Sequence, residues 1–379
     1  MHTTHPTLSR RQLLHSATAL ACGLSLRAHS QNLKHHNGWI LSGADSSQGE
    51  PHLLALERNG PRQYAWPLPG RAHDIALLPA AHNPGLGYCI ARRPGTWLYY
   101  FNLNQGALLA RIESPPDSHF YGHAASNSDG SLLYITENHY QTPSRPQPRG
   151  VIGIYQTRPP YKRLGEYNAQ GLGPHQILFD ATHQRLIIAN GGNITHPSTE
   201  REVHNLNTMQ PNISYLAAGS GKLLEQHTPP HHQLSLRHIA LAANGLLAIG
   251  AQDQAPTRDP DEPAPLVFTH HTGQALTPLP ASPQQWQNAR QYIASMAISP
   301  NANAILASAP KANQLLHWQN TQAPQILTTP DTAGIAWNPS SNSFLASNSQ
   351  GQLLNLTPNQ LTPIPPKTQW RWDNHLFVG

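Results

Sequence analysis

The 379-residue sequence carries little charge, since Asp, Glu, Lys and Arg make up only 11% of it. An average soluble domain has about 25%, and no stripe of basic and aromatic residues concentrates the few charges present. Nucleic acid is therefore not an expected partner. No apolar run reaches the length of a membrane-spanning helix, so a membrane span is not expected either. The 38% of hydrophobic residues nevertheless come in short, regular clusters, which is unlike a disordered chain.

Cysteine and the common catalytic motifs are also scarce. Of the two cysteines, Cys22 lies in the N-terminal segment and Cys89 lies in an apolar strand pattern. Loss of Cys22 on processing would leave no pair for an intramolecular disulfide. The sequence has no P-loop, no G-x-S-x-G, no H-E-x-x-H and no G-x-G-x-x-G after a strand. It therefore lacks the sequence marks of common nucleotide-binding, serine-hydrolase and zinc-protease chemistry.

The N-terminus has the layout of a twin-arginine export signal. Ser9-Arg10-Arg11-Gln12 precedes a modest apolar run that ends at Leu26. Small residues at Ala28 and Ser30 suit cleavage, so we expect a signal peptide over residues 1–30 and a periplasmic location. No acid occurs before Asp45, so removing the three arginines of this segment lowers the formal net charge from +5 to +2.

A repeated unit predicts the fold. A polar or small anchor, an apolar strand, a turn and a second strand return six times, with anchor spacings of 50, 52, 63, 57 and 39 residues. Two further strand-like pieces follow in each unit, which is typical of four-stranded propeller blades with variable loops. The anchors are His73, His123, His175, His238, Ser295 and Gly334.

The two ends of the chain supply the parts of a seventh blade. Residues 39–42, 52–56 and 63–66 read as strands two to four of a blade without its first strand. Residues 373–378, which include His375, read as a first strand with nothing after it. Joining them would remove the free sheet edges. We therefore predict that residues 31–379 form one all-β domain, a seven-bladed β-propeller closed by N-terminal strands and the C-terminal strand. A β-helix or a sandwich is the competing architecture.

Several motifs in the same order resemble the DUF1513 family. They include Phe120-Tyr121-Gly122-His123, Gly173-Pro174-His175, Leu236-Arg237-His238 and Asp373-Asn374-His375. The resemblance covers nearly all of the chain after the signal and implies an exported, twin-arginine-dependent protein with a YVTN/WD40-like propeller. It implies no established activity. Family members often resemble parts of periplasmic iron-acquisition clusters, beside imelysin-like and dihaem oxidoreductase-like proteins, which are therefore the expected partners. This sequence departs from the family at Gln176, where an acidic residue is common.

Histidines begin five of the seven predicted first strands, and these strands line a propeller channel. His73, His123, His175, His238 and His375 should therefore gather at one mouth and form the candidate metal site. The ends of the second strands reach the same mouth and add candidate cofactor-binding residues, namely Arg92, Glu137, Asn138, Asn190 and Gln252, together with Asp45 and Arg93. Neutral imidazoles with carboxylate and amide neighbours suit a transition metal such as Fe, Cu or Zn.

Other interpretations of the histidines remain open. Propeller repeats commonly use a histidine near the first strand to make hydrogen bonds within its own blade, and repeat duplication would leave such residues at equivalent positions. For the whole protein we expect a monomeric periplasmic binding or accessory protein serving metal acquisition. A metal-dependent hydrolase or oxidoreductase and a pure protein-interaction scaffold are the alternatives.

Overall fold

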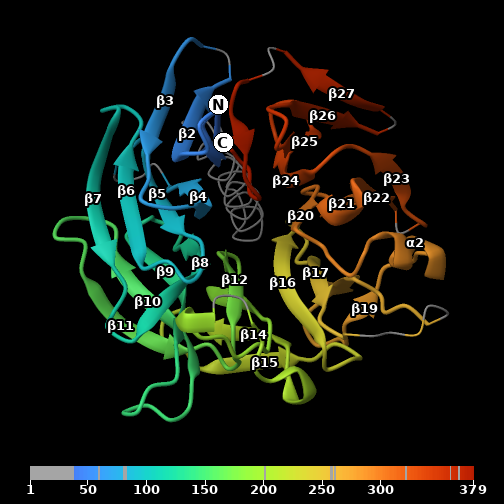
Figure 1. The fold of residues 1–379 in the computed structure, drawn as a ribbon, viewed down its shortest axis with the longest axis horizontal. Helices are drawn as coiled ribbons and strands as arrows, with labels where there is room; N and C mark the ends of the chain where they lie inside the picture. Colours follow the sequence, from blue (N-terminus) through green and yellow to red (C-terminus); the bar gives the residue numbers. More distant parts are fainter. Residues whose placement is uncertain are drawn as a thin grey trace, which may run out of the picture.

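A computed structural model describes residues 38–58, 60–79, 83–199, 202–256, 259, 262–320, 322–358, 360–365 and 368–379. Seven antiparallel sheets stand in a ring around a common axis (Figure 1). This arrangement confirms the predicted seven-bladed β-propeller. The expected signal peptide lies outside the described residues, so it stays a prediction. Within the described part of the chain, no helix is long and apolar enough to cross a membrane.

In each of the first three blades the strands follow one another in chain order from the channel outward. Their strands are β4 (Ala72–Leu77), β5 (Leu86–Ala91), β6 (Trp97–Asn102) and β7 (Ala107–Glu113); β8 (Ser118–Ser126), β9 (Leu132–His139), β10 (Arg149–Gln156) and β11 (Arg163–Asn168); and β12 (Pro174–Asp180), β13 (Arg185–Asn190), β14 (Asn212–Ala217) and β15 (Leu223–His227).

The next three blades follow the same order, and a short helix, α2 (Pro283–Asn288), connects two of them. Their strands are β16 (Leu234–Leu241), β17 (Leu247–Asp253), β18 (Val267–His270) and β19 (Thr277–Pro278); β20 (Ser295–Ile298), β21 (Ala304–Ala309), β22 (Gln314–Gln319) and β23 (Gln325–Thr328); and β24 (Thr332–Asn338), β25 (Ser343–Asn348), β26 (Leu353–Thr357) and β27 (Gln360–Ile364).

The seventh blade joins the two ends of the chain, as the sequence predicts. β1 (Trp39–Asp45) pairs on one side with β2 (Pro51–Glu57), which pairs with β3 (Gln63–Pro67). On its channel side β1 pairs with β28 (Arg371–Trp372) and β29 (Phe377–Val378). The expectation of one continuous strand over 373–378 was wrong. Residues 373–376 leave the ladder because only Ser42 and Gly43 of β1 lie opposite these four residues.

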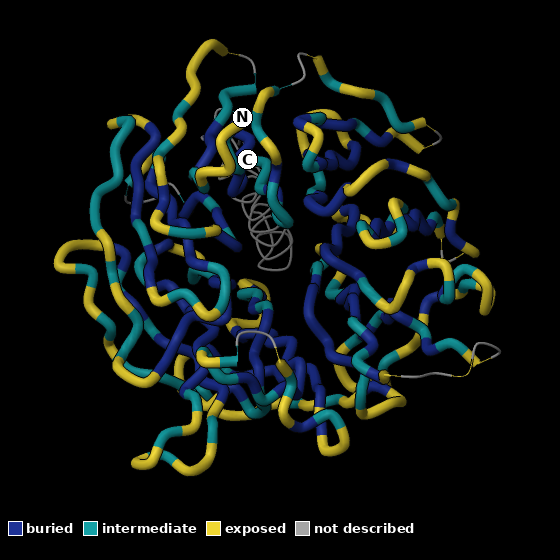
Figure 2. The backbone as a smooth tube through the Cα atoms, viewed as in Figure 1, coloured by how far each residue is buried: buried dark blue, intermediate teal, exposed yellow. Residues whose placement is uncertain are grey.

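Apolar side chains between neighbouring blades form the core. Six buried clusters together cover every contact between adjacent blades. Burial is greatest on the inner and middle strands, whereas the outer strands and loops are exposed (Figure 2). Cys89 is a free, fully buried residue of β5 and contributes to this packing. The inner strands are thus fixed from both sides, and they present their remaining side chains to the channel.

Candidate functional site

β-Bulges interrupt the inner strands where the histidines lie. The register against the second strand shifts between Ala72 and Ile75 in β4 and between Phe120 and Ala124 in β8. β12 and β16 shift in the same way beside His175 and His238. β24, which has Gly334 in place of histidine, also shifts, whereas β20, which begins with Ser295, pairs without a shift. Bulges redirect side chains and occur often beside active sites, so here they turn the rings out of the strand ladder.

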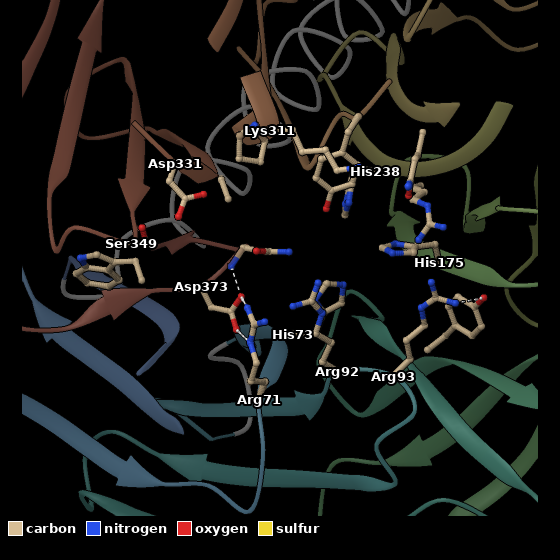
Figure 3. Close-up of a pocket in the computed structure, with 18 of the residues that line it drawn as sticks. Arg71, His73, Arg92, Arg93, His175, His238, Lys311, Asp331, Ser349 and Asp373 are labelled. Atoms are coloured by element: carbon tan, nitrogen blue, oxygen red, sulfur yellow. Dashed lines mark hydrogen bonds and ion pairs between the residues drawn. The ribbon is translucent and has the colours of Figure 1, made fainter. Parts of the chain in front are cut away.

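Five imidazoles meet in the channel, and we call His73, His123, His175, His238 and His375 the channel histidines. Ring centroids of neighbouring members lie 4.4 Å apart for His73 and His375, and 4.7 Å apart for His175 and His238. His123 lies within 4.6–5.7 Å of all four others. Figure 3 shows His73, His175 and His238 pointing into the same space. The structure therefore brings all five predicted metal-site residues together.

A glycine allows this close approach. Gly122 lies in the bulge of β8 with φ at +117°, a conformation that L side chains rarely adopt. A Cβ added there would lie 2.3 Å from Cδ2 of His73. Any side chain at this position would therefore displace the imidazole of the preceding blade.

Side chains fix the backbone of the bulges and leave the rings free. The Thr136 hydroxyl donates to the carbonyl oxygens of His123 and His175, at 3.0 and 3.2 Å. Asp74 Oδ2 accepts from the Ala124 N–H at 3.1 Å, and Gln176 Oε1 accepts from the Ile239 N–H at 2.9 Å. The residue after the histidine thus ties one blade to the next. At position 176 a neutral amide oxygen makes this contact, where Asp74 uses a carboxylate oxygen.

The ring nitrogens themselves lack partners. Six buried nitrogen atoms of the five rings have no hydrogen-bond partner among the described residues, namely Nδ1 of His73, His175 and His238, Nε2 of His375, and both nitrogens of His123. The nearest carboxylate is Asp74, whose Oδ2 lies 3.6 Å from His123 Nδ1, beyond hydrogen-bond distance. Buried polar atoms are usually satisfied. A set of histidines that only tied their own blades together would have used these nitrogens for hydrogen bonds.

The protein environment favours the neutral form of four of these rings. Burial lowers the pKa of His73, His175 and His238 well below the ordinary value of 6.5, and neighbouring imidazoles and arginines add to the effect. Burial and then His123 lower the pKa of His375 to about 3. A neutral imidazole keeps the lone pair that a metal ion requires.

Two sets of three ring nitrogens have the spacing of metal ligands. His73, His123 and His375 form one set, and His123, His175 and His238 form the other. Within each set, the candidate ligand atoms lie within 4.8 Å of one another. His123 belongs to both sets, so it is the central residue of the cluster.

Two other groups of histidines and acids already have partners. In the first, Arg163 donates to both Glu137 and Glu166, which neutralises the carboxylates beside His139. In the second, Glu225 and His227 accompany His270, whose ring contacts the Tyr215 hydroxyl at 2.7 Å and the Gln274 carbonyl at 2.9 Å. His139 Nε2 of the first group is also buried without a hydrogen-bond partner among the described residues, but it lies 3.6 Å from a carboxylate oxygen of Glu137 and of Glu166. In the second group both ring nitrogens of His270 have partners.

A cavity opens directly above the channel histidines, and we call it the mouth cavity. Its volume is about 900 Å³, and His73, His175 and His238 lie in its wall (Figure 3). Six basic and three acidic side chains also line it, which gives it a net charge of +3 with the histidines neutral. One acid, Asp373, is paired with Arg71 through contacts of 3.0 and 2.5 Å. The loop after β13 reaches the cavity through Val203.

The predicted cofactor-binding residues fall into two groups. Arg92 and Gln252 line the mouth cavity, as do Asp45 and Arg93. Glu137, Asn138 and Asn190 do not line it, so their expected place at the mouth was wrong.

The extended ladder of β8 and β9 explains part of this correction. Phe120 pairs with Glu137 beyond the bulge, so Glu137 and Asn138 still lie inside the blade. Glu137 accepts from the Tyr155 hydroxyl at 2.6 Å, and Asn138 contacts His119 Nε2 at 3.1 Å. Asn190 in turn donates to Asn212 Oδ1 at 2.9 Å and to Ser214 Oγ at 3.1 Å, both in β14, and so faces its own blade.

Sequence reasoning missed several residues of the cavity wall. Arg71 comes directly before β4, and Arg237 comes directly before His238. Asp373 and Lys311 lie in segments that connect strands. The sequence signal was available for Arg237, which stands beside His238. Nothing in the sequence signals the pairing of Arg71 with Asp373, because 302 residues separate them.

Comparisons with known proteins agree with the fold. A family model described as "Protein of unknown function (DUF1513)" matches residues 66–379. Among the curated proteins, none matches this sequence. Among solved structures, the chain is similar to Kuenenia stuttgartiensis hydrazine synthase, with a TM-score of 0.57 and 11% identity over 85% of this chain and 94% of that one. At this identity the likeness supports the propeller fold alone.

Proposed function

The chain belongs to the DUF1513 family, and we propose that it is a metal-binding propeller whose channel histidines hold a transition-metal ion. The observation that carries the proposal is the convergence of five imidazoles, six of whose buried nitrogens have no hydrogen-bond partner among the described residues. Each such atom costs about 1–3 kcal/mol when it stays unsatisfied. A metal ion would use these lone pairs and offset that cost.

The donor set limits the choice of metal. Neutral imidazole suits Fe, Cu and Zn, whereas Mg and Ca prefer oxygen ligands. Three histidines would leave at least one coordination position for another ligand, as in catalytic zinc sites. Both sets of three nitrogens meet this condition. The residues present therefore fit Fe, Cu or Zn.

The cellular role follows from the expected export. We propose that the twin-arginine segment directs the protein to the periplasm, where it acts as a monomeric binding or accessory protein in the acquisition of iron or another metal. Imelysin-like and dihaem oxidoreductase-like proteins are the proposed partners. The paired Arg10 and Arg11 support this location.

Metal uptake by tag-free protein tests the proposal. Metal-free protein is titrated with Zn(II), Cu(II) and anaerobic Fe(II), in the presence of a weak chelator that keeps the free metal too low to occupy exposed histidine pairs such as His231-His232. Wild-type protein should bind one of these metals stoichiometrically. His123→Ala should abolish binding because it removes a donor from both sets of ligands.

A matched control separates the site from the mere burial of a histidine. His317 is buried in β22, and its Nδ1 has no hydrogen-bond partner in the described part of the chain, but it is not one of the channel histidines. His317→Ala should therefore keep wild-type metal binding. If wild-type protein takes up none of the three metals, or if His123→Ala still binds stoichiometrically, the proposal fails.

A further inference from the structure

The basic side chains of the mouth cavity are concentrated next to the channel histidines. Arg92 and Arg93 follow β5, and Arg237 lies in β16 directly before His238. All three line the cavity together with the imidazoles. The cavity carries a net charge of +3, although the whole chain carries only +5 over 379 residues.

These arginines share the cavity wall with the rings. Figure 3 shows Arg92 and Arg93 around the same cavity as His73 and His175. Arg237 lines the same cavity directly before His238 in β16. A cation bound by the rings would add to this positive charge, so the site needs an anion for electrostatic balance.

The arginines also have the chemistry to recognise that anion. A guanidinium presents a planar set of donors that matches a carboxylate or a phosphate. Arg71 already forms such a two-point contact with Asp373 in the cavity wall. Arg93 is positioned by its contact with the Tyr121 hydroxyl at 3.0 Å and by the ring of Tyr121, which lies 5.1 Å from the guanidinium carbon. At about 900 Å³ the cavity has the volume of a small-molecule site.

We propose that the mouth cavity binds a small oxyanion with at least two negative charges, held by Arg92, Arg93 and Arg237 above the channel histidines. The proposal rests on the proposed function, because an oxygen of this anion would fill the coordination position that the histidines leave open. The ligand class is thus a small dicarboxylate or phosphate, free or as the chelator of the metal.

Calorimetric titration of the full chain tests the oxyanion separately from the metal. Malonate and inorganic phosphate are the two probes, and uncharged malonamide is the control ligand. Each probe is titrated into metal-free protein and into protein loaded with the metal that it takes up. At least one probe should bind metal-free protein, more weakly as salt rises, and should bind the loaded protein more tightly. Malonamide should not bind.

Arginine variants assign the binding to the cavity. The double variant Arg92→Gln, Arg93→Gln should lower the affinity for the anion about tenfold or more, because charge-assisted hydrogen bonds are lost. Arg92→Lys should lie between this variant and wild type, since it keeps the charge but loses the paired donors. Arg158→Gln removes an exposed charge outside the cavity and should leave the affinity unchanged. Melting curves check that each variant is folded.

The outcomes distinguish the two proposals. Anion binding to metal-free protein that disappears in the double variant supports the oxyanion site even if no metal binds. Metal binding without any binding of malonate or phosphate overturns the oxyanion site and leaves the metal proposal standing. Equal affinities in the double variant and in wild type also overturn it, because the anion would then bind elsewhere. Preference for malonate or for phosphate identifies the ligand class.

Discussion

The substitution His123→Phe separates a metal site from a structural role of the channel histidines. His123 is 1% exposed, and neither ring nitrogen has a hydrogen-bond partner among the described residues, since the Asp74 carboxylate lies 3.6 Å from Nδ1. Phenylalanine has a ring of similar shape that can pack edge-to-face against the neighbouring imidazoles. The change therefore removes two unpartnered polar atoms while it keeps most of the packing. The backbone contact from Thr136 to the His123 carbonyl is unaffected.

The expected effect changes sign with the metal. A buried polar group without a partner costs about 1–3 kcal/mol, so the free energy of unfolding of the metal-free variant should exceed that of wild type by about this amount. A ligand present at 100 times its Kd stabilises the folded state by about 2.7 kcal/mol. Wild-type protein should gain this stabilisation, whereas the variant should gain none.

Urea unfolding with and without metal measures both effects. Wild type, His123→Phe and the control His317→Phe are compared at the same protein concentration. A shift of the urea midpoint reports a change in stability provided that the dependence of the unfolding free energy on urea concentration is the same in all three proteins. His317→Phe should keep the metal-dependent shift. A metal-free His123→Phe variant that is less stable than wild type, together with equal metal shifts in both proteins, would refute the reasoning. The histidine would then stabilise its own blade.

Three further predictions concern pH, the interior of blade two and closure. The folded state lowers the pKa of four channel histidines, namely His73, His175, His238 and His375. Below about pH 6.5 the unfolded chain therefore binds more protons than the folded one. Each of these groups should then reduce the free energy of unfolding by about 1.4 kcal/mol per pH unit as the pH falls. Urea midpoints at pH 7.5 and 5.5 should show this loss, and His375→Phe should reduce it. Arg163→Met leaves the fully buried Glu137 without its cation, so it should cost about 3–5 kcal/mol in urea unfolding without changing metal affinity. Trp372→Ala should cost a similar amount, about 3–5 kcal/mol, because Trp372 is 4% exposed in the cluster that joins the last blade to its neighbour; an unchanged melting temperature would contradict it.

The sequence was sufficient to predict the propeller because its evidence is local and repeated. Short apolar runs and turn residues mark each strand, and the anchor spacing marks each blade. The missing first strand at one end and the isolated strand at the other predict the closure that β1, β28 and β29 make. Only the interruption at residues 373–376 escaped this reasoning, because it depends on the register against β1.

The candidate site could be predicted in part. Strand direction alone places the five histidines at one mouth, and the structure brings the centroids of neighbouring rings to 4.4–5.7 Å from each other. The bulges could not be predicted, because they depend on contacts between blades such as those of Asp74 and Gln176. For the same reason Glu137 was placed at the mouth, although the extended ladder keeps it inside the blade.

Closure of the ring and assembly of the site depend on the same segment. His375 lies between β28 and β29, and its carbonyl accepts from the Ser42 hydroxyl at 2.6 Å. That contact fixes the segment against β1 and holds the imidazole 4.4 Å from His73 and 4.7 Å from His123. The set of His73, His123 and His375 is therefore complete only when the chain ends have paired. Asp373 of the same segment pairs with Arg71 in the cavity wall. A ligand that binds this set must consequently favour the closed ring over the open one, because only the closed ring contains all three donors.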